Sequence, residues 1–420
     1  MKYLSEITLH LKNNQNIFLT GGAGVGKTTL TREIIKSFEA DAKKVAKLAS
    51  TGMAATLIGG QTLHSFFDLG IASDVKELEK NGKYELKKKV KKLIDGMALI
   101  VIDEISMVSD DLLELVSLRL TQANFNGSLL VVGDFLQLPP VVKGRGEVCY
   151  AFESLTWKEL EFKTIELTHI YRTDDTEFIS LLHNIRFGII NEQIHNYLNS
   201  FIKPLPQDLS QSTFLFGKNI SSFRHNRTQL EFFDGDSFIK EAQIVRHDTK
   251  VKDYEIERFL DDARIEKELE LKIGVPVLFT RNAWNYFNGE RGEVVNIDNE
   301  FVYVQKSNGR VVKLEPVVQS RTKWVEKIVE GSKELVEETL FSVYQYPIKL
   351  AFAITIHKSQ GMSIEDLIID TGEIFAPSQF YVALSRSSDP KRLNLIAPQR
   401  QWYELAFVNT KALEFVKNAY

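Results

Sequence analysis

The chain has 420 residues and a formal net charge of −4, and 44% of its residues are hydrophobic. These values suit a globular protein of two to four domains and exclude a surface coated in positive charge, so any nucleic-acid surface has to be a local basic channel. A single cysteine, Cys149, excludes an intrachain disulfide. No apolar stretch approaches the roughly 20 residues that span a bilayer, and the first residues lack the apolar run of a signal peptide, which favours a cytoplasmic protein with no membrane contact.

Short apolar strands alternate with amphipathic helices through the first third of the chain. A predicted strand at 17–19 runs into a glycine loop and then into a helix at about 27–38. Further strands are predicted at 45–49, 99–102 and 129–132. Apolar runs as continuous as these are typical of strands buried on both faces, so we predict an α/β fold whose parallel sheet is covered by helices.

The glycine loop after the first strand is the strongest chemical signal. Its sequence GGAGVGKT fits the P-loop pattern G-x-x-x-x-G-K-[ST], with the required strand before it and helix after it. Glycines let backbone N–H groups close around phosphate oxygens, Lys27 would hold the β- and γ-phosphates of ATP, and the Thr28 hydroxyl would bind Mg²⁺. The residues predicted to contact the nucleotide here are Gly22, Ala23, Gly24, Val25, Gly26, Lys27, Thr28 and Thr29.

Two loops after later strands carry the polar groups expected beside a P-loop. Asp103 and Glu104 follow the strand at 99–102, where Asp103 would hold Mg²⁺ and Glu104 would orient and deprotonate the attacking water. The stretch GDFLQLPP follows the next strand, and the amide of Gln137 can reach a γ-phosphate or a water beside it. The alternative readings are an ordinary acidic loop and a proline-terminated turn, and the upstream P-loop argues against the first.

A second α/β pattern occupies the later part of the chain, with predicted strands at 213–216, 350–355, 367–370 and 393–396. Between about residues 271 and 346 the sequence pattern changes to one that predicts short antiparallel strands separated by Gly and Asn turns. We therefore predict a small β-barrel inserted into the second α/β region.

Arg172 and Arg386 lie in different halves of the chain, each at the end of a short apolar motif. A P-loop enzyme needs positive charge on the leaving phosphate, and an arginine delivered from another lobe makes hydrolysis depend on closure. Taken singly, each arginine is more often a solvated surface residue.

Two further features allow two readings each. The lysine run at 87–92 lies in a polar insertion at 68–93, where it either binds DNA at a fork or forms a solvated helix face, and the second reading is favoured. Trp284, Tyr286 and Phe287 either stack on bases or fill the seam of the inserted barrel, and the seam is favoured.

A set of motifs together resembles a known family. In chain order they are TGGAGVGKTT, STGMAA, GGQTLHSFF, LIVIDEISM, GDFLQLPPV, IYR, NGERGEV, AITIHKSQGMS and YVALSRS. This order resembles superfamily 1B helicases, and within them the petite integration frequency (PIF) family, relatives of RecD and of the phage helicase Dda. The resemblance runs from about residue 17 to residue 396.

The resemblance implies two tandem RecA-like lobes that use ATP and Mg²⁺ to move 5′-to-3′ along single-stranded DNA and to unwind duplex DNA. Lobe 1A would comprise 1–67 and 94–175, with a small wedge, 1B, at 68–93. Lobe 2A would comprise 176–270 and 347–420, with a Src-homology-3-like barrel, 2B, at 271–346. Expected partners are single-stranded, forked and partial-duplex DNA, with G-quadruplex DNA as a further candidate, and the expected state is a monomer.

Carried over residue by residue, the resemblance also implies a DNA-binding set. Its members are Thr51, Gly52, His64, Ser65, Phe66, Pro139, Lys218, His357, Lys358 and Ser359. Gln360 and Gly361 would couple this contact to the nucleotide. Hydroxyls, backbone amides and a lysine bind phosphate without reading sequence, and aromatic rings stack on any base. Because Phe66 and Phe67 are adjacent, at least one of them is expected in the core.

Three functions therefore stay open on the sequence. The first is a DNA helicase, which the paired lobes, the two arginines and the DNA-facing loops favour. The second is a translocase that strips proteins from nucleic acid and unwinds poorly, and it predicts DNA-stimulated ATP hydrolysis without strand separation. The third is a nucleotide-dependent switch that binds a protein partner, and it predicts hydrolysis that is insensitive to nucleic acid.

Overall fold

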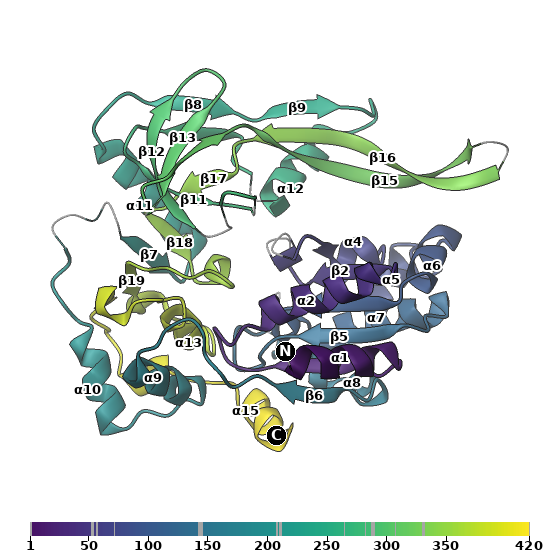
Figure 1. Ribbon diagram of the computed structural model, residues 1–420, viewed down its shortest axis with the longest axis horizontal. Helices are drawn as coiled ribbons and strands as arrows, with labels where there is room; N and C mark the ends of the chain where they lie inside the picture. Colours follow the sequence, from purple (N-terminus) through teal and green to yellow (C-terminus); the bar gives the residue numbers. More distant parts are fainter. Residues whose placement is uncertain are drawn as a thin grey trace. The chain divides into compact units, whose positions relative to one another are not determined.

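The computed structural model describes residues 2–51, 54–55, 58–70, 72–141, 146–206, 209, 212–263, 265–281, 283–286, 290–306, 308–329 and 332–419 (Figure 1). The chain forms two compact units. The first comprises Met1–Pro204, Ile356–Gly361 and Leu367–Tyr420, and the second comprises Leu205–Thr355 and Met362–Asp366. The first unit is therefore assembled from distant parts of the sequence.

A six-stranded sheet forms the centre of the first unit, in the order β3-β2-β4-β5-β1-β6. All of its pairings are parallel. Its strands are β1 (Ile17–Thr20), β2 (Val45–Ala49), β3 (Gln61–Thr62), β4 (Leu99–Asp103), β5 (Ser128–Val132) and β6 (Lys163–Glu166). The predicted parallel sheet and its four predicted strands are confirmed, while β3 and β6 were not predicted.

Alternate residues of each strand enter different cores, which explains the continuous apolar runs. Ile17 and Leu19 of β1 pack with residues of α1 (Lys2–Lys12) and α2 (Lys27–Ala40). Phe18, between them, packs into a second core with residues of α7 (Asp110–Ala123). The sheet is thus covered on both faces, as its sequence requires.

Helix α15 (Thr410–Ala419) belongs to this second core although it lies almost 400 residues after β1. Ala412 and Val416 are buried in it, and the Phe415 ring stacks on that of Phe152 with the centroids 4.2 Å apart. Lys411 adds ion pairs to Glu147 and Glu153. This second core is therefore completed by a segment from the far end of the chain.

The predicted insertion at 68–93 contains α5 (Val75–Lys80) and the start of α6 (Lys88–Asp95), and it follows the short helix α4 (Leu63–Phe66). Leu78 and Ile94 anchor it in the α7 core. The buried Arg119 of α7 donates hydrogen bonds to the carbonyls of Lys83 and Tyr84. In the lysine run, Lys87 pairs with Asp68, and Lys88 and Lys92 are exposed.

The rest of the first unit supplies further helices and one pair of strands. The helices are α8 (Leu155–Glu159), α9 (Thr176–Arg186), α10 (Glu192–Ser200), α13 (Gln379–Leu384) and α14 (Trp402–Leu405). The parallel pair is β19 (Leu367–Asp370) with β20 (Leu393–Ile396), and both strands match their predicted bounds. Among the described residues, no helix has both the length and the apolar character needed to cross a bilayer.

The second unit contains a five-stranded sheet in the order β14-β13-β12-β11-β17, with antiparallel pairings throughout. Its strands are β11 (Pro276–Phe279), β12 (Arg291–Ile297), β13 (Val302–Lys306), β14 (Val311–Leu314) and β17 (Ile348–Leu350). Val277, Phe279, Val294 and Val304 fill its core. Tyr286 joins this core and stacks on Phe279, whereas Trp284 is exposed, and Phe287 lies outside the described residues.

The single strand predicted at 350–355 is wrong. The segment divides into β17, which pairs antiparallel with β11, and β18 (Ala353–Thr355), which pairs in parallel with β7 (Thr213–Phe216). The partner strand of β17 runs antiparallel to it, whereas the partner strand of β18 runs parallel to it. The predicted strand therefore breaks between Leu350 and Ala353. Helix α11 (Asn219–Phe232) follows β7. The side-chain amide of its Asn226 donates a hydrogen bond to the carbonyl of Ala353 and accepts one from the N–H of Ala353.

A long hairpin of β15 (Val317–Val329) and β16 (Ser332–Gln345) is the largest feature that the sequence did not predict. β16 also pairs with β9 (Gln243–Arg246). A separate pair joins β8 (Phe238–Glu241) to β10 (Glu268–Leu271), and α12 (Asp253–Ala263) lies between these strands in sequence.

Candidate nucleotide site

The P-loop joins β1 to α2 with the geometry that phosphate binding needs. Gly24 and Gly26 have φ values of 78° and 87°, in the left-handed region that favours glycine. A Cβ on Gly24 would also lie 2.8 Å from Cβ of Arg172. Helix α2 begins at Lys27, so its N-terminus and free N–H groups face the loop. The predicted helix start is therefore confirmed.

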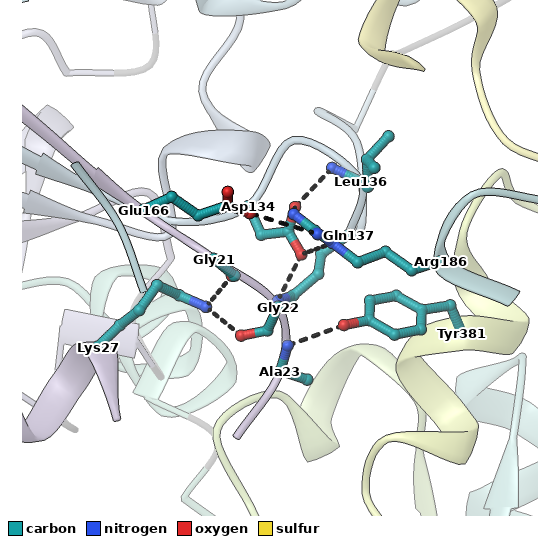
Figure 2. Close-up of polar contacts among 10 residues, drawn as sticks. All are labelled: Gly21, Gly22, Ala23, Lys27, Asp134, Leu136, Gln137, Glu166, Arg186 and Tyr381. Atoms are coloured by element: carbon teal, nitrogen blue, oxygen red, sulfur yellow. Dashed lines mark hydrogen bonds and ion pairs between the residues drawn. The ribbon is translucent and has the colours of Figure 1, made fainter. Parts of the chain in front are cut away.

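The half-buried Lys27 side chain folds back on this loop. Its Nζ donates hydrogen bonds to the carbonyls of Gly21 at 2.6 Å and Gly22 at 2.8 Å (Figure 2). Burial lowers the pKa of Lys27, and the nearby carboxylates of Asp134 and Glu104 oppose that shift. The ammonium group thus sits inside the loop with neutral carbonyls as its hydrogen-bond partners. Of the next residues, Thr28 is half-buried and Thr29 is exposed.

The acidic pair lies at the end of β4. Asp103 is buried, and its carboxylate accepts a hydrogen bond from the N–H of Glu104 at 2.9 Å. Glu104 has a φ of 53°, a strained backbone for a non-glycine residue and one that is often found at functional sites. Burial is the main cause that raises the pKa of both carboxyls, and Asp103 raises that of Glu104 further, to about 7.

Burial of the acidic pair favours neutral carboxyls more strongly than the nearby charges of Lys27, Arg32 and Arg386 favour ionised ones, so ionising both carboxyls calls for further positive charge. A divalent cation would supply it, and Mg²⁺ commonly uses one or two carboxylates together with waters and substrate phosphates. Asp103 and the hydroxyl of Thr28 suit that role. No group of three or more acidic, His or Cys side chains that would hold a metal on its own exists among the described residues.

The loop after β5 centres on a buried ion pair that the sequence reading missed. Arg186 of α9 donates two hydrogen bonds to the carboxylate of Asp134, both at 3.0 Å (Figure 2). The same carboxylate accepts the N–H of Leu136 at 3.1 Å and the side-chain amide of Gln137 at 3.4 Å. Gln137 therefore lies in the site, as predicted, with its amide held by Asp134.

A second missed residue, Tyr381 of α13, contacts the P-loop directly. Its hydroxyl accepts a hydrogen bond from the N–H of Ala23 at 2.8 Å (Figure 2). A Cβ on Gly22 would lie 3.2 Å from the same hydroxyl, so glycine at 22 leaves room for this approach. Tyr381 is only 3% exposed.

Both predicted arginines lie in the first unit, Arg386 buried and Arg172 half-buried. Arg172 donates to the carbonyl of Ser385, and burial lowers its pKa to about 10. Arg386 donates to the carbonyls of Val382 and Ser359 and to the hydroxyl of Ser385. Burial and the neighbouring Arg172 lower the pKa of Arg386 to about 9, while Glu104 opposes the shift. Two guanidinium groups that are partly or fully buried and hydrogen-bonded to neutral oxygens are suited to bind an anion.

Gln360 and Gly361 follow the short helix that carries His357, Lys358 and Ser359. Gln360 is buried, and its side-chain nitrogen has no hydrogen-bond partner within the part of the chain that the structure describes. A buried orphan donor is costly and calls for an acceptor supplied from outside the protein. Gly361 has a φ of 76°, so the turn after Gln360 requires glycine.

The predicted DNA-binding residues of the first segment differ in accessibility. Ser65 is exposed and His64 is half-buried, whereas Pro139 is buried. Phe66 and Phe67 both lie in the core, with their rings in edge contact, so the expectation that at least one is structural is confirmed. The half-buried Thr51 accepts the N–H of Ala54 with its hydroxyl. Gly52 lies outside the described residues.

The other predicted DNA-binding residues lie in both units. Lys218 of the second unit is exposed and directly precedes α11. His357 and Lys358 of the first unit are half-buried. Ser359 is buried, with its hydroxyl donating to the carbonyl of Ile356 and its carbonyl accepting from Arg386. Ser359 therefore links a predicted DNA-binding segment to a predicted catalytic arginine.

The chain is similar to one family of proteins along nearly its whole length. The family model for PIF1-like helicases matches residues 2–196. An ATP-dependent DNA helicase Pif1 from Campylobacter jejuni subsp. jejuni is 40% identical over 425 residues, covering 96% of this chain and 94% of that protein. A crystal structure of Bacteroides sp Pif1 in complex with ADP-AlF4 gives a TM-score of 0.82 at 26% identity, covering 100% of this chain and 96% of that one. Bacteroides Pif1 bound to ssDNA gives 0.68 at 27% identity with the same coverage.

Proposed function

The chain belongs to the PIF1-like helicase family, and from that membership we propose an ATP-dependent DNA helicase that moves 5′-to-3′ along single-stranded DNA and unwinds duplexes. The observation that carries the proposal is the convergence on one P-loop of Lys27, Glu104 and the two arginines, Arg172 and Arg386, from distant parts of the sequence. This set matches the needs of phosphoryl transfer to water.

ATP is held, in this proposal, by the backbone N–H groups of the P-loop and by Lys27. Binding requires the Lys27 ammonium to leave the carbonyls of Gly21 and Gly22 and to turn to the β- and γ-phosphates. Mg²⁺ held by Thr28 and Asp103 supplies charge neutralisation to those phosphates. The orphan amide of Gln360 provides a further donor for the nucleotide.

Hydrolysis then depends on three kinds of group. Glu104 accepts a proton from the attacking water, and its raised pKa suits a base that works near neutrality. Arg172 and Arg386 stabilise the negative charge that builds on the transferred phosphoryl group. Gln137, held by Asp134, lies where its amide can sense whether the γ-phosphate is present.

We expect kcat/KM for ATP to rise with pH through about 7 and then to level off. Below that pH the Glu104 carboxyl carries a proton and cannot accept another, so the rate falls as pH falls. The profile is measured with initial rates at low ATP and saturating single-stranded DNA. Glu104→Gln should lower the rate and abolish the rise, and a profile of the unmodified chain that is flat across neutrality would contradict the base role.

The coupling to DNA is proposed on the predicted contact residues. Thr51, Gly52, His64 and Ser65 would bind the strand on one side, and Lys218, His357 and Lys358 on the other. The bond between the Ser359 carbonyl and Arg386 supports this idea, because a strand gripped at 357–359 then acts on the catalytic arginine. The segment at 68–93 is proposed as the wedge, and the antiparallel sheet of 271–346 as the Src-homology-3-like barrel.

The first test is the steady-state ATP hydrolysis rate with and without an unstructured single-stranded oligonucleotide at low salt, where phosphate contacts are strongest. We expect a large stimulation by the oligonucleotide and, in a second assay, ATP-dependent separation of a fork with a 5′ single-stranded tail. Stimulation of hydrolysis without strand separation would favour the translocase. A hydrolysis rate that DNA does not change would favour the nucleotide-dependent switch.

The remaining features of the proposal are the monomeric state, the cytoplasmic location and the additional partners, forked and G-quadruplex DNA. The monomeric state and the additional DNA partners stay predictions from the family resemblance, and the cytoplasmic location stays a prediction from the sequence. Competition between an unstructured oligonucleotide and a folded G-quadruplex in the same hydrolysis assay would rank the DNA partners.

A further inference from the structure

The hydroxyl of Tyr381 lies among the groups assigned to the terminal phosphate of ATP. It accepts the Ala23 N–H on the side of the P-loop that faces Asp134 and Arg186 (Figure 2). A Cβ on Gly22 would lie 3.2 Å from this hydroxyl and 3.8 Å from Cδ of Arg186, so the two side chains meet at the same glycine. The sequence reading assigned no role to this tyrosine.

The hydrogen of this hydroxyl has no acceptor within the part of the chain that the structure describes. Tyr381 oxygen receives the Ala23 N–H, and no bond donated by Tyr381 is found among the described residues. Asp134 is the nearest anionic candidate, but its carboxylate already accepts two bonds from Arg186, one from the Leu136 N–H and one from Gln137. Tyr381 is thus a buried side chain with one donor left unused, a costly arrangement unless a ligand completes it.

The donor remains available at neutral pH. Burial, with a smaller contribution from Asp134, raises the pKa of Tyr381 to about 12. The phenol therefore keeps its proton at neutral pH. Its hydroxyl can donate a hydrogen bond as well as accept one.

We propose that Tyr381 contacts the substrate, its hydroxyl donating a hydrogen bond to the terminal phosphate of ATP while accepting the Ala23 N–H. This role rests on the proposed nucleotide site. Because ADP lacks that phosphate, the bond distinguishes ATP from ADP. It also ties helix α13 to the phosphate, and Arg386 lies two residues beyond the end of that helix. Loss of the phosphate therefore removes one of the bonds that hold the segment carrying the arginine.

The test compares two nucleotides in the variant Tyr381→Phe, which removes only the hydroxyl. Equilibrium dissociation constants for ADP and for the non-hydrolysable analogue AMP-PNP are measured on the full chain with Mg²⁺, by displacement of a fluorescent ADP. A hydrogen bond to a charged group is worth about a tenfold change in affinity or more. We expect AMP-PNP binding to weaken by at least that factor while ADP binding stays unchanged, which also shows that the variant is folded.

Tyr346→Phe is the matched control, because it also deletes a buried tyrosine hydroxyl, one that donates to the carbonyl of Glu300 in the second unit. It should leave both affinities unchanged. Equal weakening of ADP and AMP-PNP in Tyr381→Phe would overturn the proposal, because it would mean that the tyrosine only supports the P-loop. Tighter binding of both ADP and AMP-PNP would also overturn the proposal. It would mean that the hydroxyl competes with a nucleotide phosphate for the Ala23 N–H. Failure of the unmodified chain to bind either nucleotide would overturn the nucleotide site itself.

Discussion

Replacing Arg386 with alanine should lower the rate of ATP turnover by roughly a thousandfold, while AMP-PNP still binds. The guanidinium group is 2% exposed, hydrogen-bonded to neutral oxygens, and close enough to Arg172 and Glu104 for their charges to affect its pKa. Such a group gains most from the extra negative charge that appears in the transition state, so its loss affects kcat more than binding. The rate is measured at saturating ATP and single-stranded DNA.

Two further variants sharpen this test. Arg386→Lys keeps the charge but loses the planar fork of donors, so it should recover only part of the rate. Arg400→Ala makes the same deletion at an exposed arginine of the first unit, whose bond goes to the carbonyl of Ile374, and it should leave turnover unchanged. Normal turnover in Arg386→Ala would refute the catalytic role.

Replacing Lys27 with alanine should reduce ATP hydrolysis at least about a hundredfold and weaken ATP binding, while single-stranded DNA still binds. The loop carries no other lysine or arginine, and the Nζ of Lys27 already lies against its carbonyl oxygens. Hydrolysis and DNA binding are measured separately, the second by fluorescence anisotropy of a labelled oligonucleotide without nucleotide.

Lys36→Ala is the control for this deletion, because Lys36 lies on the same helix, is exposed and pairs only with Glu33 among the contacts seen. It should leave hydrolysis intact. Hydrolysis that survives in Lys27→Ala would rule out the P-loop assignment, and loss of DNA binding in the same variant would point to a folding defect.

The parts of the site that are local in sequence could be predicted from the sequence. The P-loop, Lys27, Asp103 and Glu104 each lie in or directly after a strand that apolar periodicity identifies. Parallel strands bring their carboxyl ends to one edge, so these residues meet by topology alone. The left-handed conformation of Gly26 follows from the same motif.

The parts that depend on distant contacts could not be predicted in this way. The bond from Ala23 to Tyr381 spans 358 positions, and no periodicity selects that tyrosine from others on apolar helices. Asp134 was visible in its motif, but its partner Arg186 looks like any arginine at a helix end. The β15–β16 hairpin was missed because its polar, charge-rich strands lack the apolar runs used to find the others.

The packing of α15 into the second core has a consequence for synthesis of the protein. Helix α15 covers Phe152 and packs in the core that contains Phe18, yet more than 240 residues separate it from β6, the last strand of that sheet. At 5 to 20 residues per second, the ribosome needs roughly 10 to 50 seconds to make that stretch. During this interval the nascent first unit displays an aromatic surface that only its final helix can cover. Transiently exposed apolar surface of this kind is what chaperones protect during synthesis.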